Sequence, residues 1–287
     1  MKLIIGLIVV FGSVLGGYVL SKGNLLALWQ PLELLIIGGA ALGALIIANP
    51  FSVSLRALRG FIDVCRAPAY PRERYMELLS LLYALLTKAR KDGLMSIEDD
   101  IEDPEQSELF QTYPGVLGDH HARDFLCDYM RIVVSGGVSP FELDNLMQLE
   151  LETHHEEAHA PSHALSQIAD ALPGFGIIAA VLGIVITMSL IGGDPAVVGK
   201  KVAAALVGTL LGILLAYGFV GPVATALAKR AHDESKFLEC IRVCILASVQ
   251  GYSPQIAVEF GRKTMLSHLR PAFAELEQHV KGTPASD

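Results

Sequence analysis

Apolar residues are concentrated in four long runs, and each run is long enough to form a helix that crosses a lipid bilayer. Such a helix needs about 20 mainly apolar residues. The runs cover residues 3–20, 31–48, 172–191 and 202–228. Polar segments separate them, and the longest of these lies between the second and third runs. The pattern predicts an all-α, polytopic membrane protein with four transmembrane helices and a helical cytoplasmic domain.

The fourth run predicts a helix that packs closely against other helices. Small residues recur every four positions along it and therefore share one helix face, a spacing that allows close helix approach. These residues are Ala204, Gly208, Gly212 and Ala216. Thr209 lies beside this stripe, near the middle of the run. Pro222 cannot donate a backbone hydrogen bond, so we expect a kink or flexible point there.

The third run carries a matching stripe of small residues and opens at Pro173, a residue that suits the first turn of a helix. The stripe comprises Gly176, Ala180, Gly183 and Thr187. Near the bilayer centre the four runs hold no ionisable side chain, although such a group usually marks an ion or proton relay. Glu33 lies close enough to the end of the second run to reach the interface. Two small-residue faces without an acid predict that a partner's helix supplies one.

The order of apolar and polar segments predicts four regions. Residues 1–50 hold the first two membrane helices, residues 51–171 a cytoplasmic helical domain, residues 172–228 the last two membrane helices and residues 229–287 a cytoplasmic C-terminal region. The first run is longer than the ~7–15 apolar residues of a signal peptide and lacks its cleavage site, so we expect it to be retained. Basic residues place the large insertion and both termini in the cytoplasm. They are Arg56, Arg59, Arg66, Arg72, Arg74, Lys229, Arg230 and Lys236.

The insertion contains an amphipathic segment, residues 74–90, whose leucines follow the helical period and predict a helical bundle. The segment closes on the basic residues Lys88, Arg90 and Lys91, and an acidic run over residues 98–103 follows at once. This charge pattern is typical either of a solvated surface or of a docking site for a partner of complementary charge. Ser139 and Glu142 form a capping box that predicts a helix reaching Pro161.

Two features add candidate chemistry. Residues 155–159 match H-E-x-x-H, the zinc-binding pattern of metalloproteases, but the match is short and lacks an evident third ligand. Cys240 and Cys244 share a helix face and are interpreted as packing residues.

The formal net charge of −8 argues against a nucleic-acid partner. Ser253-Pro254 predicts the start of a last helix, and we expect residues 282–287 to be disordered.

The stretch ALVGTLLGIL at residues 205–214, with Pro222 after it, resembles the signature of the MotA family of flagellar motor stator subunits. Similar matches extend over nearly the whole chain. They include QPLELLIIGGA in the second run, ALPGFGIIAAVLGIV in the third and GYSPQIAVEFGRKT near the end. The resemblance is strongest to the proton-driven members from enteric-type Gram-negative bacteria.

The resemblance implies a homo-pentamer in the bacterial inner membrane, built around the single-span partner MotB, whose aspartate would carry the ion. The complex would convert proton flow into torque and would need no cofactor and no zinc. Arg90 and Glu98 match the charged residues that meet the rotor protein FliG. Pro173 and Pro222 match the coupling prolines. Ala180 and Thr209 match residues facing the ion path, and sodium-driven relatives place a threonine where Ala180 stands.

Two alternatives stay open at this point. The ExbB/TolQ group also surrounds an acid-bearing partner with small-residue helices, but its members typically have three spans. A membrane zinc protease is the alternative from a different class, and the metal content of the purified protein would distinguish it. The resemblance favours a stator subunit without enzymatic activity.

Overall fold

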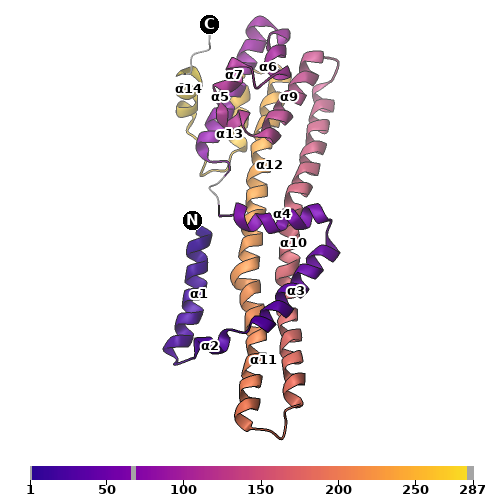
Figure 1. The fold of residues 1–287 in the computed structure, drawn as a ribbon. Coiled ribbons are helices and arrows are strands. Elements are labelled where there is room, and N and C mark those ends of the chain that lie inside the picture. Colours follow the sequence, from indigo (N-terminus) through magenta and orange to yellow (C-terminus); the bar gives the residue numbers. More distant parts are fainter. Residues whose placement is uncertain (1, 66–68, 283–287) are drawn as a thin grey trace. The chain divides into compact units, whose positions relative to one another are not determined.

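The computed structural model describes residues 2–65 and 69–282, and within these ranges every regular element is helical (Figure 1). This confirms the all-α prediction. Arg66 and residues 283–287 of the tail expected to be disordered lie outside the described residues, whereas Gly282 is the last residue of a helix. The chain divides into two compact units. We call residues 1–67 with 157–230 the membrane unit, and residues 68–156 with 231–287 the polar unit.

The membrane unit contains the predicted spanning helices, and four helical stretches in the described part of the chain are long and apolar enough to cross a bilayer. Its elements are α1 (Lys2–Leu20), α2 (Leu25–Leu28), α3 (Pro31–Ala48), α4 (Phe51–Asp63), part of α10 (Pro140–Met188), α11 (Pro195–Leu215), a π-helical turn (Ala216–Val220) and part of α12 (Gly221–Val249). The third predicted span therefore ends at Met188 rather than at residue 191.

Helix α10 corrects two expectations about proline. The helix opened by Ser139 was expected to end at Pro161, and a new helix was expected to begin at Pro173. Both prolines instead lie inside one continuous helix of 49 residues. An interior proline costs a helix about 3 kcal/mol or more. Here buried apolar contacts on the same helix, including Leu165 and Leu172, offset that cost.

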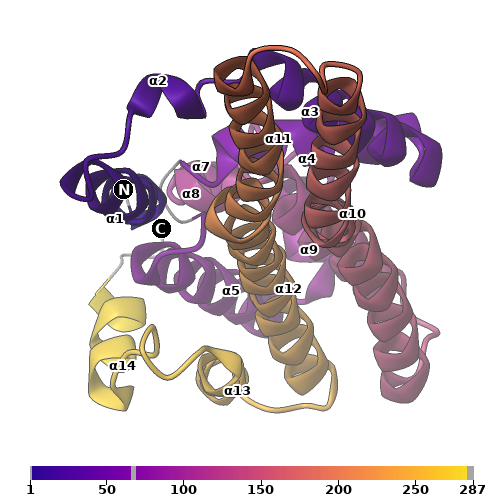
Figure 2. The same ribbon diagram turned by 90° about the horizontal axis from the view of Figure 1, so that it is seen from below.

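Helices α10 and α11 run antiparallel and side by side, joined by the connection at residues 189–194 (Figures 1 and 2). A Cβ atom added at Gly176 would lie only 2.9 Å from the carbonyl oxygen of Gly208, and one at Gly212 only 2.8 Å from the carbonyl oxygen of Leu172. A Cβ at Gly183 would lie 2.8 Å from the Cβ of Ala205. The predicted stripes thus pack against each other at Gly176, Gly208 and Gly212, whereas Ala205 rather than the predicted Ala204 meets Gly183. They do not by themselves require a partner's helix, which corrects that part of the sequence argument.

The expected irregularity at Pro222 takes the form of the π-helical turn that precedes it. In this turn the N–H of Gly221 donates to the carbonyl of Ala216, five residues earlier. Pro222 follows this turn directly, inside one helical run from Pro195 to Val249, so its missing N–H removes a backbone hydrogen bond from the interior of that run. Helix α1 packs against the same turn, since a Cβ at Gly218 would lie 3.1 Å from Cγ1 of Val10.

Helix α4 packs its small residues against α12 within the membrane unit. Ser54, Ala57 and Gly60 form its buried face, and a Cβ at Gly60 would lie 2.7 Å from Cδ2 of Leu227. Arg230 donates to the carbonyl oxygen of Asp63 at 2.6 Å, which satisfies a backbone acceptor at the end of α4.

The polar unit is built around α5, and the predicted leucine periodicity is confirmed. Its elements are α5 (Arg72–Asp92), a 3₁₀ turn (Leu94–Ile97), α6 (Glu98–Glu102), α7 (Glu108–Gln111), α8 (Pro114–Leu117), α9 (His120–Ser135), the start of α10, the end of α12, α13 (Pro254–Thr264) and α14 (Phe273–Gly282). The five leucines of α5 expected in a core are at most 3% exposed; they are Leu78, Leu81, Leu82, Leu85 and Leu86.

The capping box is confirmed, because Ser139 N donates to Glu142 at 3.0 Å and Glu142 N donates to Ser139 at 3.2 Å. Ser253 begins α13, but α13 is not the last helix, since α14 follows it. Cys240 and Cys244 are buried against Gly261. The hydrogen bond between these cysteines and their burial raise the pKa of Cys244, which agrees with a packing role.

The contact between α10 and α11 predicts unequal effects for two neighbouring glycines. Gly176→Ala should lower the melting temperature of the purified protein in detergent, because overpacking against backbone atoms costs about 1–3 kcal/mol. Gly174→Ala is the matched control on the same helix, since a Cβ there meets nothing within 4 Å. It should leave the melting temperature unchanged or slightly higher. Equal melting temperatures for the two variants would contradict the close contact.

Candidate functional site

The two residues expected along the ion path lie at the crossing of α10 and α11. The backbone N of Ala180 lies 3.4 Å from a Cβ placed on Gly208, the residue before Thr209. Ala180 and Thr209 are both half-buried within the chain. The other threonine of the stripes, Thr187, is buried and donates its hydroxyl to the carbonyl of Gly183 at 2.8 Å. Its hydroxyl hydrogen is thus engaged within its own helix.

Glu33 enters the same crossing, which the sequence argument missed. Its carboxylate oxygens lie 3.6 Å from a Cβ placed on Gly183 and 3.1 Å from one placed on Gly208. The oxygen nearer Gly208 is buried and has no hydrogen-bond partner among the described residues. Glu33 lies in the first turn of its span, and for that reason the sequence predicted that its carboxylate reaches the membrane interface. The glycines of the third and fourth spans were the sequence feature that could have indicated space for this carboxylate between the helices.

The two candidate coupling prolines lie next to residues that join α10 to the helices after it. Leu172, which precedes Pro173, places its carbonyl against Gly212. Gly221, which precedes Pro222, would bring a Cβ to 3.9 Å from the Cβ of Ala169 on α10. Pro173 is half-buried inside α10, and Pro222 is exposed. Pro173 is therefore an interior residue of its helix and not the residue that starts it.

The two candidate docking residues are both exposed on the polar unit. Arg90 lies in the last turn of α5 and donates to the carbonyl oxygen of Tyr252 at 3.2 Å. Glu98 is the first residue of α6. Between them Gly93 has a φ of 92°, a left-handed conformation that glycine adopts without steric cost. This glycine and the 3₁₀ turn connect the basic end of α5 to the acidic start of α6.

Other charges of the predicted bipolar pattern are engaged inside the unit. Lys88 forms an ion pair with Asp100 at 2.8 Å, and the buried Asp100 also accepts a hydrogen bond from Ser107 at 2.6 Å. These contacts join α5, α6 and the start of α7. Lys88 and Asp100 are therefore structural, whereas Arg90 and Glu98 keep their side chains at the surface.

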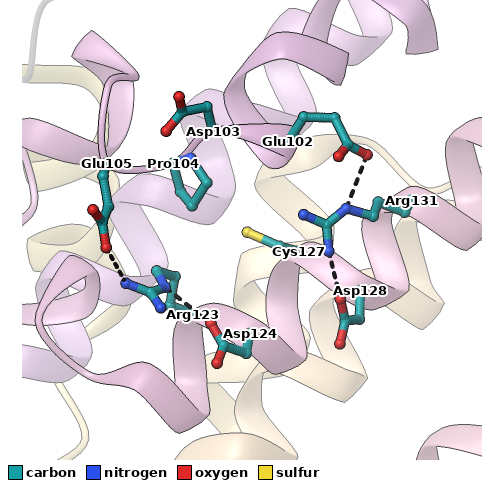
Figure 3. A pocket seen from close by; sticks show the side chains of 9 residues that line it. All are labelled: Glu102, Asp103, Pro104, Glu105, Arg123, Asp124, Cys127, Asp128 and Arg131. Carbon is teal, nitrogen blue, oxygen red and sulfur yellow. Dashed lines mark hydrogen bonds and ion pairs between the residues drawn. The ribbon is translucent and has the colours of Figure 1, made fainter.

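Two arginines of α9 form ion pairs around a hollow that they line, and one of these pairs engages Glu102 of the acidic run (Figure 3). Arg131 pairs with Glu102 at 2.9 Å and with Asp128, and Arg123 pairs with Glu105 at 3.1 Å and with Asp124 at 2.9 Å. Burial raises the pKa of Cys127 in this hollow to about 12, so its thiol is protonated and unreactive near neutral pH. Arg123 and Arg131 follow the acidic run by 20 and 28 residues, a separation over which no local sequence pattern predicts the pairing.

The H-E-x-x-H segment is not brought together with a third ligand among the described residues. His155 instead lies 3.0 Å from the hydroxyl of Ser235. The neighbouring His154 belongs to a different group of possible ligands in the polar unit.

Comparison with known proteins identifies the family. Residues 4–93 match the family model described as "Motility protein A N-terminal", and residues 118–240 match the "MotA/TolQ/ExbB proton channel family". The chain is 45% identical to "Motility protein A" of Salmonella typhimurium over 98% of its own length and 95% of the relative. The chain belongs to the motility protein A family. The match at residues 4–93 favours this family over the ExbB/TolQ group.

Other relatives and solved structures agree with this membership. The chain is 41% identical to "Chemotaxis protein LafT" of Vibrio parahaemolyticus over 97% of its length and 98% of the relative. The flagellar MotAB stator complex of Bacillus subtilis contains a chain with a TM-score of 0.73 and 26% identity, over 96% of this chain and 97% of that chain. A chain of C. jejuni MotAB shares the fold, with a TM-score of 0.77 and 20% identity over 93% and 96% of the two chains.

The ion pair inside the polar unit yields a stability prediction. Asp100→Ala should lower the melting temperature, since the loss of a hydrogen bond to a charged group costs about 1.5–3 kcal/mol. Glu98→Ala is the matched control, because Glu98 is exposed on the same short helix. It should leave the melting temperature nearly unchanged. A thermal shift as large for Glu98→Ala as for Asp100→Ala would show that Asp100 is not structural.

Proposed function

We propose that this chain is a stator subunit of the bacterial flagellar motor, which forms a proton-conducting complex with a MotB-like partner and converts ion flow into torque on the rotor. The observation that carries the proposal is the crossing of α10 and α11, with Ala180, Thr209 and Glu33 beside it, in a chain aligned almost end to end with motility protein A. Membership of a proton channel family supports a channel component rather than a membrane zinc protease.

The partner supplies the ion-carrying aspartate, and five copies of this chain surround the partner's helices in the inner membrane. The titles of the solved neighbours name MotAB complexes, which supports the partner. The basic residues that follow α3 and the π-helical turn support a cytoplasmic location for the polar unit and both termini. Glu33 adds an acid of this chain near one end of the path, and buried carboxylates inside membranes commonly belong to ion pathways.

Ala180 and Thr209 face the ion path, and the path carries protons. Sodium needs several oxygen ligands to replace its water, as hard cations do, whereas a proton can be carried by one carboxylate and water. Ala180 offers no side-chain oxygen, which leaves the hydroxyl of Thr209 as the main nearby oxygen ligand from these two helix faces. These two facing stripes therefore offer sodium few oxygen ligands.

Pro173 and Pro222 couple ion transfer to movement of the polar unit. Each breaks the regular backbone bonding of a helix, and the π-helical turn before Pro222 makes this point locally adjustable. Arg90 and Glu98 dock on the rotor protein FliG through opposite charges. Their exposure supports this role, since interfacial charges that steer partners lie at the surface.

Proton flux into liposomes tests the proposed channel. This chain alone should conduct no protons, because Glu33 lies in the first turn of α3 and one carboxylate cannot bridge a hydrocarbon core of ~30 Å. Co-reconstitution with the single-span partner should produce flux, and replacement of the partner's aspartate by asparagine should abolish it. A robust proton flux from this chain alone would contradict the proposal.

Charge reversal tests the proposed docking surface. Arg90→Glu and Glu98→Lys should reduce the torque of bead-bearing motors more than Arg90→Ala and Glu98→Ala do. Neutralisation removes only a weak exposed pair, whereas reversal adds repulsion. Lys263→Glu and Glu156→Lys are matched controls at other exposed positions of the polar unit and should leave torque unchanged. Equal torque losses from the controls and from the docking variants would refute a specific surface.

A further inference from the structure

Three possible metal ligands converge in the polar unit from three different helices. His121 comes from the first turn of α9, His154 from α10 and Glu234 from α12. One ligand atom of each lies within 4.8 Å of the other two. Nε2 of His154 is 3.2 Å from Oε1 of Glu234, and the rings of His121 and His154 meet edge to face with their centres 5.2 Å apart.

The distances suit a small tetrahedral cation. Zinc binds nitrogen and carboxylate oxygen at about 2.0–2.2 Å, so neighbouring ligand atoms around it lie roughly 3.3 Å apart. The pair of His154 and Glu234 already has this separation. His121 is exposed, so its imidazole can rotate toward the pair without disturbing a core. Two histidines and one glutamate are also a ligand set that zinc uses when a fourth position is left for water.

The chemistry of the ligands favours zinc over the common hard cations. Imidazole suits zinc and similar transition metals, whereas magnesium and calcium prefer sites made entirely of oxygen ligands. The ordinary alternative is a histidine–carboxylate ion pair beside a ring contact. That alternative accounts for His154 and Glu234, but it gives His121 no reason to direct a ligand atom at both of them.

We propose that His121, His154 and Glu234 form a zinc-binding site that ties α9 to α10 and α12. The site differs from the H-E-x-x-H segment that the sequence suggested, which uses His155 and His159. It is also independent of the proposed ion path. Since α10 and α12 each continue into the membrane unit, bound zinc would hold together the polar-unit ends of two membrane helices.

Zinc titration of the purified full-length chain in detergent, prepared with an affinity tag free of histidine, tests the site. Competition with a chromophoric chelator should show saturable binding of one Zn²⁺ per chain. A free zinc concentration about 100-fold above the dissociation constant should raise the melting temperature by several degrees. His121→Ala, His154→Ala and Glu234→Gln should each weaken binding by at least about 10-fold, because even changes around metal ligands have effects of that size.

Neighbouring residues provide matched controls. His120→Ala alters the other histidine at the start of α9, and His155→Ala alters the residue next to His154; neither should change zinc affinity. If His154→Ala fails to fold, His154→Gln replaces it, with its metal-free melting temperature as the check. The proposal is overturned if no saturable binding occurs. It is equally overturned if the control variants weaken binding as much as the ligand variants, or if only His155→Ala and His159→Ala do so.

Discussion

The backbone contact between α10 and α11 is the constraint on which the membrane unit depends. Lipid chains are as apolar as the helices, so burial from water does not drive these helices together, and close packing must do so. Gly176 and Gly212 allow the two backbones to touch. The same absence of side chains at Gly183 and Gly208 leaves room for the carboxylate of Glu33. Tight packing and a polar group in the membrane therefore arise from one set of glycines.

The π-helical turn marks where this regular packing changes. Before the turn, Ala205, Gly208 and Gly212 of α11 face α10. The turn inserts an extra residue into the helical repeat and so rotates the face that follows. Beyond it Val223 and Ala224 are buried, while Pro222 is exposed. The chain thus has a tightly fixed crossing followed directly by a point where the backbone hydrogen bonding is irregular.

Residues at helix ends predicted several helices accurately, whereas stabilisation by contacts between distant residues could not be predicted from the sequence. Helix α3 has the predicted bounds because Pro31 suits a first turn and Asn49-Pro50 ends the helix. Helix α10 passes through Pro161 and Pro173 because its buried contacts outweigh the destabilisation by an interior proline. The sequence prediction had considered that destabilisation for an isolated helix. The ion pair of Arg131 and Glu102 joins residues 29 positions apart. It depends on how α6 packs on α9, which no local pattern reveals.

Internal pairing changes what the charge pattern of the polar unit offers to a partner. The sequence contains a basic cluster followed by an acidic run, but it does not show which of these charged residues are paired inside the folded unit and which are exposed. In the folded unit Lys88 and Asp100 neutralise each other, and α9 neutralises Glu102. Exposed charge of opposite sign is left at Arg90 and Lys91 on one side of Gly93, and at Glu98 and Asp99 on the other. Because the left-handed conformation of Gly93 determines how the chain turns between these groups, the fold reduces a diffuse pattern to a short bipolar surface. Such a surface constrains the orientation of a partner as well as its charge.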